Sequence, residues 1–216
     1  MSIINKFFKL NKEDKTMVYL FMGVLKNIVF ASFKLLFGLI TSSIWLLANG
    51  IFYIVIALSR VFSIKEYLKT KKVDNQNKEI IEKDNYKLSG VLLIILGVSY
   101  FILSICMYNK LGESHFEGYI VYGVAFMAFW NFGSSIYGIN KFKMTHSPII
   151  RGTRITNLAT ALTSIVTTQV VLLDNFSEFE EHNIQNGIAG MAVSAIIVIM
   201  GISMIIKIEK EKKAND

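Results

Sequence analysis

The chain has 216 residues, of which 53% are hydrophobic and 18% charged, and its formal net charge is +7 at pH 7. Six long apolar stretches take up most of this length, so little remains for a separate soluble domain of ordinary size. The composition therefore argues against a soluble enzyme and predicts an all-α integral membrane protein.

Each apolar stretch has about 20 residues or more, which is enough for a helix to cross a bilayer core of roughly 30 Å. A transmembrane barrel is disfavoured because its strands would alternate apolar and polar residues, whereas these runs are continuous. None of the six contains Asp, Glu or His, so the usual ligands of a divalent cation are missing at hydrocarbon depth. In chain order, the predicted transmembrane helices are Met17–Ile40, Ser42–Ile64, Leu88–Tyr108, Gly118–Asn140, Ile155–Leu173 and Gly187–Ile206.

The basic residues gather on one side of the predicted bundle, before the first span and after the second, fourth and sixth. Arg60 is counted here with the group that follows the second span. The opposite side has Lys110 among acidic residues, so the positive-inside rule places both termini in the cytoplasm. The net charge reflects this asymmetry. We therefore expect anionic lipid headgroups on the cytoplasmic side as partners, and no nucleic acid.

The sequence divides into three predicted parts. Residues 1–16 form a basic cytoplasmic N-terminus, for which an amphipathic helix on the inner membrane surface and a frayed tail are both open. Residues 17–207 form the six-helix transmembrane domain, and residues 208–216 form a short charged cytoplasmic tail. Pro148 is expected in a loop, which leaves every span free of a proline kink. We expect a multi-pass protein of a bacterial plasma (inner) membrane.

Two lysines are expected within the first span. Lys34 is near the outer end, where its side chain is expected to snorkel to water. Lys26 is close to mid-depth, where an isolated ammonium costs on the order of 2.5–3.5 kcal/mol. The sequence leaves two alternatives open for Lys26: it snorkels inward, or it faces a cavity.

Small residues recur every seven positions in the third and sixth spans. Such a stripe lies on one helix face and lets two backbones approach closely in lipid. We therefore expect these spans to pack against each other or against a symmetry mate. The predicted helix-packing residues are Gly90, Gly97, Ser104, Gly187, Ser194 and Gly201.

The fifth span has a polar face of threonines at spacings of four, three and four. A polar stripe of this length favours a bundle interior or a watery cavity, although contact between helices alone would also explain it. Other polar groups fall inside the first, second and fourth spans. Together the candidate cavity-lining residues are Lys26, Asn49, Tyr53, Asn131, Thr156, Thr160, Thr163 and Thr167.

The passage Lys34–Gly50, KLLFGLITSSIWLLANG, resembles the first hairpin of the cation diffusion facilitator family. That family has a lysine, a glycine, a tight Thr/Gly-Ser turn and then Leu-Leu-Ala-Asp-Ala. Residues Asn157–Ser164, NLATALTS, are similar to its fifth-span motif His-x-Leu-Ser-Asp-Ala-Leu-Ser-Ser. The resemblance implies a cation-efflux-like bundle of six transmembrane helices, with both termini cytoplasmic, that transports by alternating access.

In that family, His and Asp residues four apart on spans two and five form a tetrahedral zinc site. The corresponding positions here are Phe52 and Ile56 on span two, with Thr156 and Thr160 on span five, and Asn49 replaces the acid of the hairpin motif. No family ligand is present at these positions. We therefore expect no metal site and no cofactor, and the family's C-terminal cytoplasmic domain is not expected either.

Two functions stay open. The first is a secondary transporter of a small solute or ion, with neutral or anionic cargo favoured by the lysine and the polar side chains. The second is a non-transporting scaffold, receptor or accessory subunit, with a homodimer also open. Its contact surfaces would be the basic inner loop Lys65–Lys87 and the acidic outer loop Asp174–Gln185. No enzyme is expected, because the sequence has neither a phosphate-binding glycine loop nor a nucleophile elbow.

Overall fold

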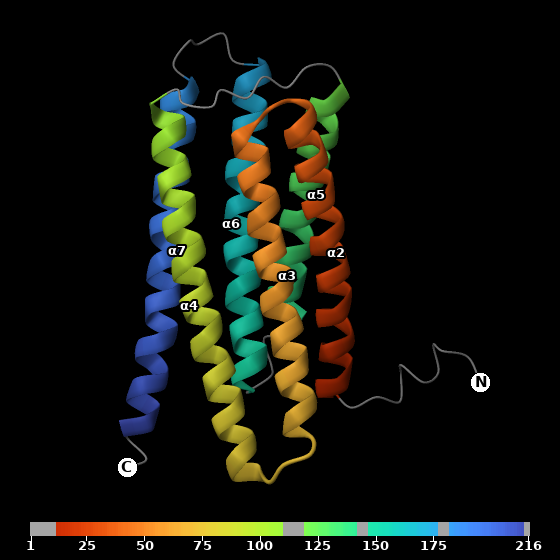
Figure 1. Ribbon diagram of the computed structural model, residues 1–216, viewed down its shortest axis with the longest axis vertical. Coiled ribbons are helices and arrows are strands. Elements are labelled where there is room, and N and C mark those ends of the chain that lie inside the picture. Colours follow the sequence, from red (N-terminus) through yellow and green to blue (C-terminus); the bar gives the residue numbers. More distant parts are fainter. Residues whose placement is uncertain (1–11, 110–118, 142–146, 177–181, 214–216) are drawn as a thin grey trace, which may run out of the picture.

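The computed structural model describes residues 12–109, 119–141, 147–176 and 182–213, and this part of the chain is helical apart from short connections. The helices run side by side along the long axis of the molecule (Figure 1). They are α2 (Lys12–Ile40), α3 (Ile44–Thr70), α4 (Asn75–Tyr108), α5 (Tyr119–Lys141), α6 (Pro148–Phe176) and α7 (His182–Lys213). The prediction of an all-helical protein is confirmed. Most of the N-terminal segment predicted at residues 1–16 lies outside the described residues.

The length and the hydropathy of the helices identify the protein as a multi-pass membrane protein. α2, α3, α4, α6 and α7 are each long and apolar enough to cross a bilayer. α5 is not among them, and Asn131, Ser134 and Ser135 interrupt its apolar sequence near the middle. The crossing expected at Gly118–Asn140 therefore stays a prediction. The start of α2 and the end of α7 lie at the same end of the bundle (Figure 1), and their cytoplasmic location also stays a prediction.

The basic inner loop predicted at Lys65–Lys87 is wrong in its extent, because most of it is helical. α3 continues to Thr70 and α4 begins at Asn75, so only a short turn separates the two helices. Charged pairs one turn apart support these polar helix ends, with the Lys83 Nζ 2.7 Å from the Glu79 Oε1. The helices thus continue past the apolar stretches that predicted them.

Three other predicted boundaries differ from the structure in the same direction. Pro148 begins α6 instead of lying in a loop, because proline lacks an N–H that would be unpaired in the first helical turn anyway. α7 continues to Lys213, through most of the tail predicted at 208–216. The outer loop predicted at Asp174–Gln185 is also shorter, since α6 ends at Phe176 and α7 begins at His182.

The bundle is built from three helix pairs, α2 with α3, α4 with α7, and α5 with α6. α6 also contacts α3, α4 and α7, which places it at the centre. The apolar segments of α6 and α3 are 61% and 56% buried, against 28% for α7. Because α3 and α6 are enclosed by other helices, their polar side chains can be shielded from lipid.

All six predicted helix-packing residues lie in the contact between α4 and α7, which run antiparallel. A missing or small side chain at these positions lets the two backbones approach closely. α4 and α7 therefore pack against each other within one chain. The facing pairs, from one end of the contact to the other, are Gly187 with Tyr108, Gly190 with Ser104, Ser194 with Gly97, and Gly201 with Gly90.

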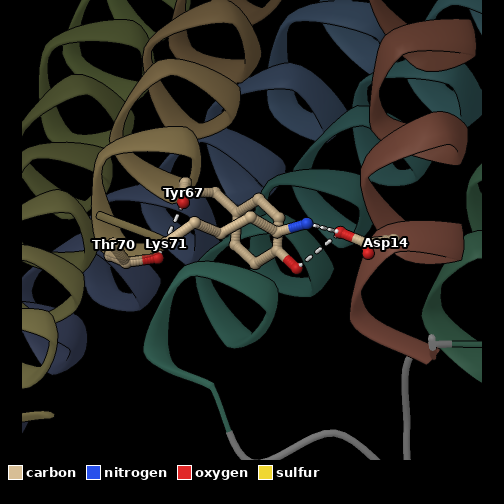
Figure 2. Close-up of polar contacts among 4 residues, drawn as sticks. All are labelled: Asp14, Tyr67, Thr70 and Lys71. Atoms are coloured by element: carbon tan, nitrogen blue, oxygen red, sulfur yellow. Dashed lines mark hydrogen bonds and ion pairs between the residues drawn. The ribbon is translucent and has the colours of Figure 1, made fainter. Parts of the chain in front are cut away.

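Polar contacts hold the α2–α3 hairpin at both ends. Near the start of α2, the Asp14 Oδ1 accepts a hydrogen bond from the Tyr67 hydroxyl at 3.0 Å and forms an ion pair with Lys71 (Figure 2). At the other end, Ser42 has a left-handed backbone with φ 52°, and the Ser43 side chain caps α3. These contacts fix the position of α2 along the axis of α3. This position sets the depth of the α2 lysines within the bundle.

Candidate functional site

The threonine stripe predicted on the fifth span lies on α6 and faces the interior of the bundle. Thr156, Thr160, Thr163 and Thr167 are each at most 4% exposed. Each hydroxyl donates to a backbone carbonyl three or four residues earlier, at 2.8 to 3.0 Å. This bonding satisfies the hydroxyl donors within α6 itself, so the stripe is stable without a ligand.

A buried polar layer connects α3, α5 and α6 near the middle of the bundle. The Tyr53 and Ser164 hydroxyl oxygens are 3.2 Å apart. The Asn131 side-chain amide donates to Ser164 Oγ at 2.6 Å and also to the Tyr53 hydroxyl. All three side chains are buried, so at this depth the layer closes the space between α3 and α6.

Lys34 points into the protein, which contradicts the expectation that it snorkels to water. Its side chain is 4% exposed, and its Nζ lies 3.5 Å from the Asn49 Oδ1 and 4.5 Å from the centre of the Tyr53 ring. Thr167 Oγ1 lies 3.4 Å from the same Asn49 oxygen. The short α2–α3 turn directs this face of α2 toward α3. There the Asn49 amide oxygen and the face of the Tyr53 ring stabilise the Lys34 ammonium.

Arg60 is a candidate functional residue whose position differs from the prediction. The sequence pattern places it in the basic group after the second span, but it lies within α3 and is 5% exposed. Its guanidinium donates to the Asn157 Oδ1 on α6, and its Nε has no hydrogen-bond partner among the described residues. A signal was present, since position 60 falls inside the apolar stretch Ser42–Ile64.

A cavity of about 170 Å³ lies beside Arg60, between α2, α3, α5 and α6. Lys26 projects into it and donates to the Ser134 Oγ on α5 at 2.8 Å. This position favours the cavity-facing alternative for Lys26 over inward snorkelling. The cavity is lined by Tyr19, Met22, Gly23, Lys26, Arg60, Ser134, Tyr137, Gly138 and Asn157.

The structure separates the eight predicted cavity-lining residues into two groups. Lys26 alone lines the cavity. The other seven lie in the adjacent closed core, where they bond to one another or to the backbone. These seven are Asn49, Tyr53, Asn131, Thr156, Thr160, Thr163 and Thr167.

The cavity is electropositive. Lys26 and Arg60 line it, and no Asp or Glu does. Two cations together with hydroxyl and amide groups suit a small anion, because charge-assisted hydrogen bonds are the strongest that such side chains make. Among the residues that the structure describes, no group of three or more His, Cys, Asp or Glu could hold a metal ion.

Asn27 is a second polar residue that the sequence analysis missed. It is 0% exposed on α2, and neither its Nδ2 nor its Oδ1 has a hydrogen-bond partner in the described part of the chain. We expect Asn27→Leu to raise the free energy of unfolding by about 1–3 kcal/mol, because it removes an unpaired buried amide. Asn49→Leu is the control and should destabilise, since the Asn49 amide donates to the Trp45 carbonyl at 2.9 Å. Denaturant unfolding in detergent measures both, and a less stable Asn27→Leu would contradict the prediction.

No protein-family model matches this chain, and no curated protein matches it either. The fold and the site nevertheless define a class. The chain is a polytopic helical membrane protein with a basic cavity between α2, α3, α5 and α6, which the exposed side chains of Met22 and Tyr137 line in part.

Proposed function

We propose that the protein is a secondary transporter that carries a small anionic solute across the membrane by alternating access. The observation that supports this proposal is the cavity with Lys26 and Arg60 on its walls and no carboxylate beside them. Charged side chains within a membrane bundle are costly, and they typically mark a pathway or a binding site. A bound anion would offset that cost.

The size and the donors of the cavity limit the cargo. A volume of about 170 Å³ equals roughly five or six water molecules at the density of the liquid. The Arg60 guanidinium offers a planar pair of donors that suits two oxygens of one anion, and Lys26 adds a second positive charge. The cargo we propose is a small carboxylate or an inorganic oxyanion.

Lys34 provides a second positive position for the transport cycle. It lies eight residues beyond Lys26 on α2, which is about 12 Å along the helix. The layer of Tyr53, Asn131 and Ser164 lies across the bundle between the cavity and the opposite end of α3. We assign this layer the role of the closed gate, which opens when the cavity closes.

The resemblance to the cation diffusion facilitator family stays an expectation, and it is compatible with this proposal. The family's metal-ligand positions correspond here to buried Phe52 and Ile56 on α3 and to self-satisfied Thr156 and Thr160 on α6. We propose that a cation-efflux-like frame without these ligands has changed its cargo from a cation to an anion. The bacterial plasma membrane stays the expected location.

Flux measurements in reconstituted vesicles test the proposal. We expect saturable uptake of formate or phosphate, and none of alanine or potassium. Lys26→Gln should lower anion flux roughly tenfold, because it removes one charged donor from the cavity. Thr160→Val is the matched control and should leave flux unchanged, since the Thr160 hydroxyl bonds to the Thr156 carbonyl and does not line the cavity. Flux equal to that of empty vesicles for every solute would contradict transport.

The second candidate is a non-transporting membrane scaffold. The closed layer of Tyr53, Asn131 and Ser164 favours it, because hydrogen bonds that join α3, α5 and α6 suit a static bundle. A stoichiometric protein partner captured in detergent, together with absent flux, would support this alternative over transport.

A further inference from the structure

We propose that a groove between α2 and α3, on the outer surface of the bundle, binds one anionic phospholipid. The groove has a volume of about 450 Å³. It shares no lining residue with the cavity of Lys26 and Arg60, so this proposal is independent of transport.

The groove is apolar along most of its length and basic at one end. Phe21 on α2 and Val61 and Leu68 on α3 are exposed apolar residues that line it. Lys65 and Lys69 lie on either side of Leu68 toward the end of α3, and the last lysine of the groove, Lys72, lies just after α3. About 12 Å along the helix axis separates Val61 from Lys69. An amphiphile with an apolar chain and an anionic head matches this order.

The basic end carries a surplus of positive charge. Lys69 forms an ion pair with Glu66, with the Nζ 2.6 Å from the Oε1. Lys65 and Lys72 have no acidic partner among the residues described. By the positive-inside rule this end faces the cytoplasm, where a basic cluster at the membrane surface attracts anionic headgroups.

The two walls of the groove are held together beside its basic end. Asp14 at the start of α2 bonds to Tyr67 and Lys71 of the α3 end (Figure 2). Lys71 is therefore occupied by Asp14 and is not a groove residue. A groove with fixed walls does not have to be ordered by its ligand, which lowers the entropic cost of binding.

Lipid binding to the purified full-length protein in neutral detergent tests the proposal. Native mass spectrometry is used with phosphatidylglycerol and phosphatidylcholine of identical acyl chains. We expect the anionic lipid to bind roughly tenfold more tightly at a stoichiometry that includes one preferred site. The triple variant Lys65→Gln, Lys69→Gln and Lys72→Gln should lose this preference.

A matched triple variant separates the groove from the total charge of the inner face. Lys87→Gln, Lys207→Gln and Lys210→Gln removes the same charge from α4 and α7, and it also breaks one exposed ion pair, that of Lys87 with Glu209. We expect it to retain the preference for phosphatidylglycerol. Equal loss in both triple variants would overturn the proposal, because it would show attraction by net charge alone.

Two further measurements test the commitment to a whole lipid. Val61→Trp fills the apolar part of the groove while keeping every lysine, and it should weaken phosphatidylglycerol binding. Unchanged binding in this variant would overturn the proposal. Soluble glycerol phosphate, which has the anionic group without acyl chains, should not compete. Full competition by glycerol phosphate would assign the site to free phosphate and would also overturn the proposal.

Discussion

Arg60→Leu is expected to lower anion flux by on the order of 100-fold without making the protein less stable. The Arg60 guanidinium is buried, donates to the Asn157 amide and is not neutralised by any carboxylate lining the cavity. Arg60→Leu loses the hydrogen bond to the Asn157 Oδ1, but it also removes the desolvation cost of a buried charge, and we expect this gain to offset the loss. The loss of function should therefore be separate from any loss of fold.

Flux in vesicles and thermal unfolding in detergent are the two measurements for this prediction. Arg60→Lys keeps a positive charge but loses the planar pair of donors, so it should restore part of the flux. Arg151→Leu is the matched control. Arg151 pairs with Glu211 at 3.5 Å toward one end of α6 and does not line the cavity, so flux should stay unchanged. Normal flux in Arg60→Leu would show that Arg60 has a structural role only. A midpoint of thermal unfolding that falls together with the flux would show the same.

Gly201→Leu is expected to have the largest effect on stability. A Cβ atom at Gly201 would lie 2.7 Å from the Gly90 carbonyl oxygen and 3.0 Å from the Ile94 backbone nitrogen. These neighbours are backbone atoms, so they can move away only if α4 and α7 separate. Overpacking of this kind costs about 1–3 kcal/mol and occasionally more, and we expect Gly201→Ala within that range and Gly201→Leu above it.

Gly133→Ala is the control for the glycine series. It lies on α5, and a Cβ atom there would have no heavy atom within 4 Å. Alanine has a higher helix propensity than glycine, so this variant should be unchanged or slightly more stable. The midpoint of thermal unfolding in detergent measures the series. Equal midpoints for Gly201→Leu and Gly133→Ala would contradict a close α4–α7 contact.

The helical architecture follows from local sequence. Continuous apolar runs longer than a bilayer core can form only helices in lipid, because every backbone N–H and C=O must be bonded within the segment. The polar helix ends were harder to predict, because the apolar stretch ends at the first charged residues although the helix continues beyond them. Asn75–Lys87 is polar and still forms the start of α4, where pairs such as Lys83 with Glu79 stabilise the extra turns.

The candidate site was predicted less well than the fold. The sequence singled out Lys26 and the α6 threonine stripe, and the structure places Lys26 in the cavity and the threonines in the closed core. Arg60 was missed because a charge near the end of an apolar run resembles the flank of a span. The burial of Lys34 could not be predicted from its depth along α2, because it depends on the direction in which the side chain points.

The amino-acid sequence is sufficient to predict the class of molecule, the number of helices in the described part and the faces that are small or polar. Apolar length, residue spacing and helix geometry are local properties, and no neighbour is needed to read them. Which polar faces meet depends on how the helices pack. The rotation of each helix about its axis depends on packing against its neighbours, and that rotation brings Lys26 and Arg60 to one cavity and turns Lys34 toward Asn49.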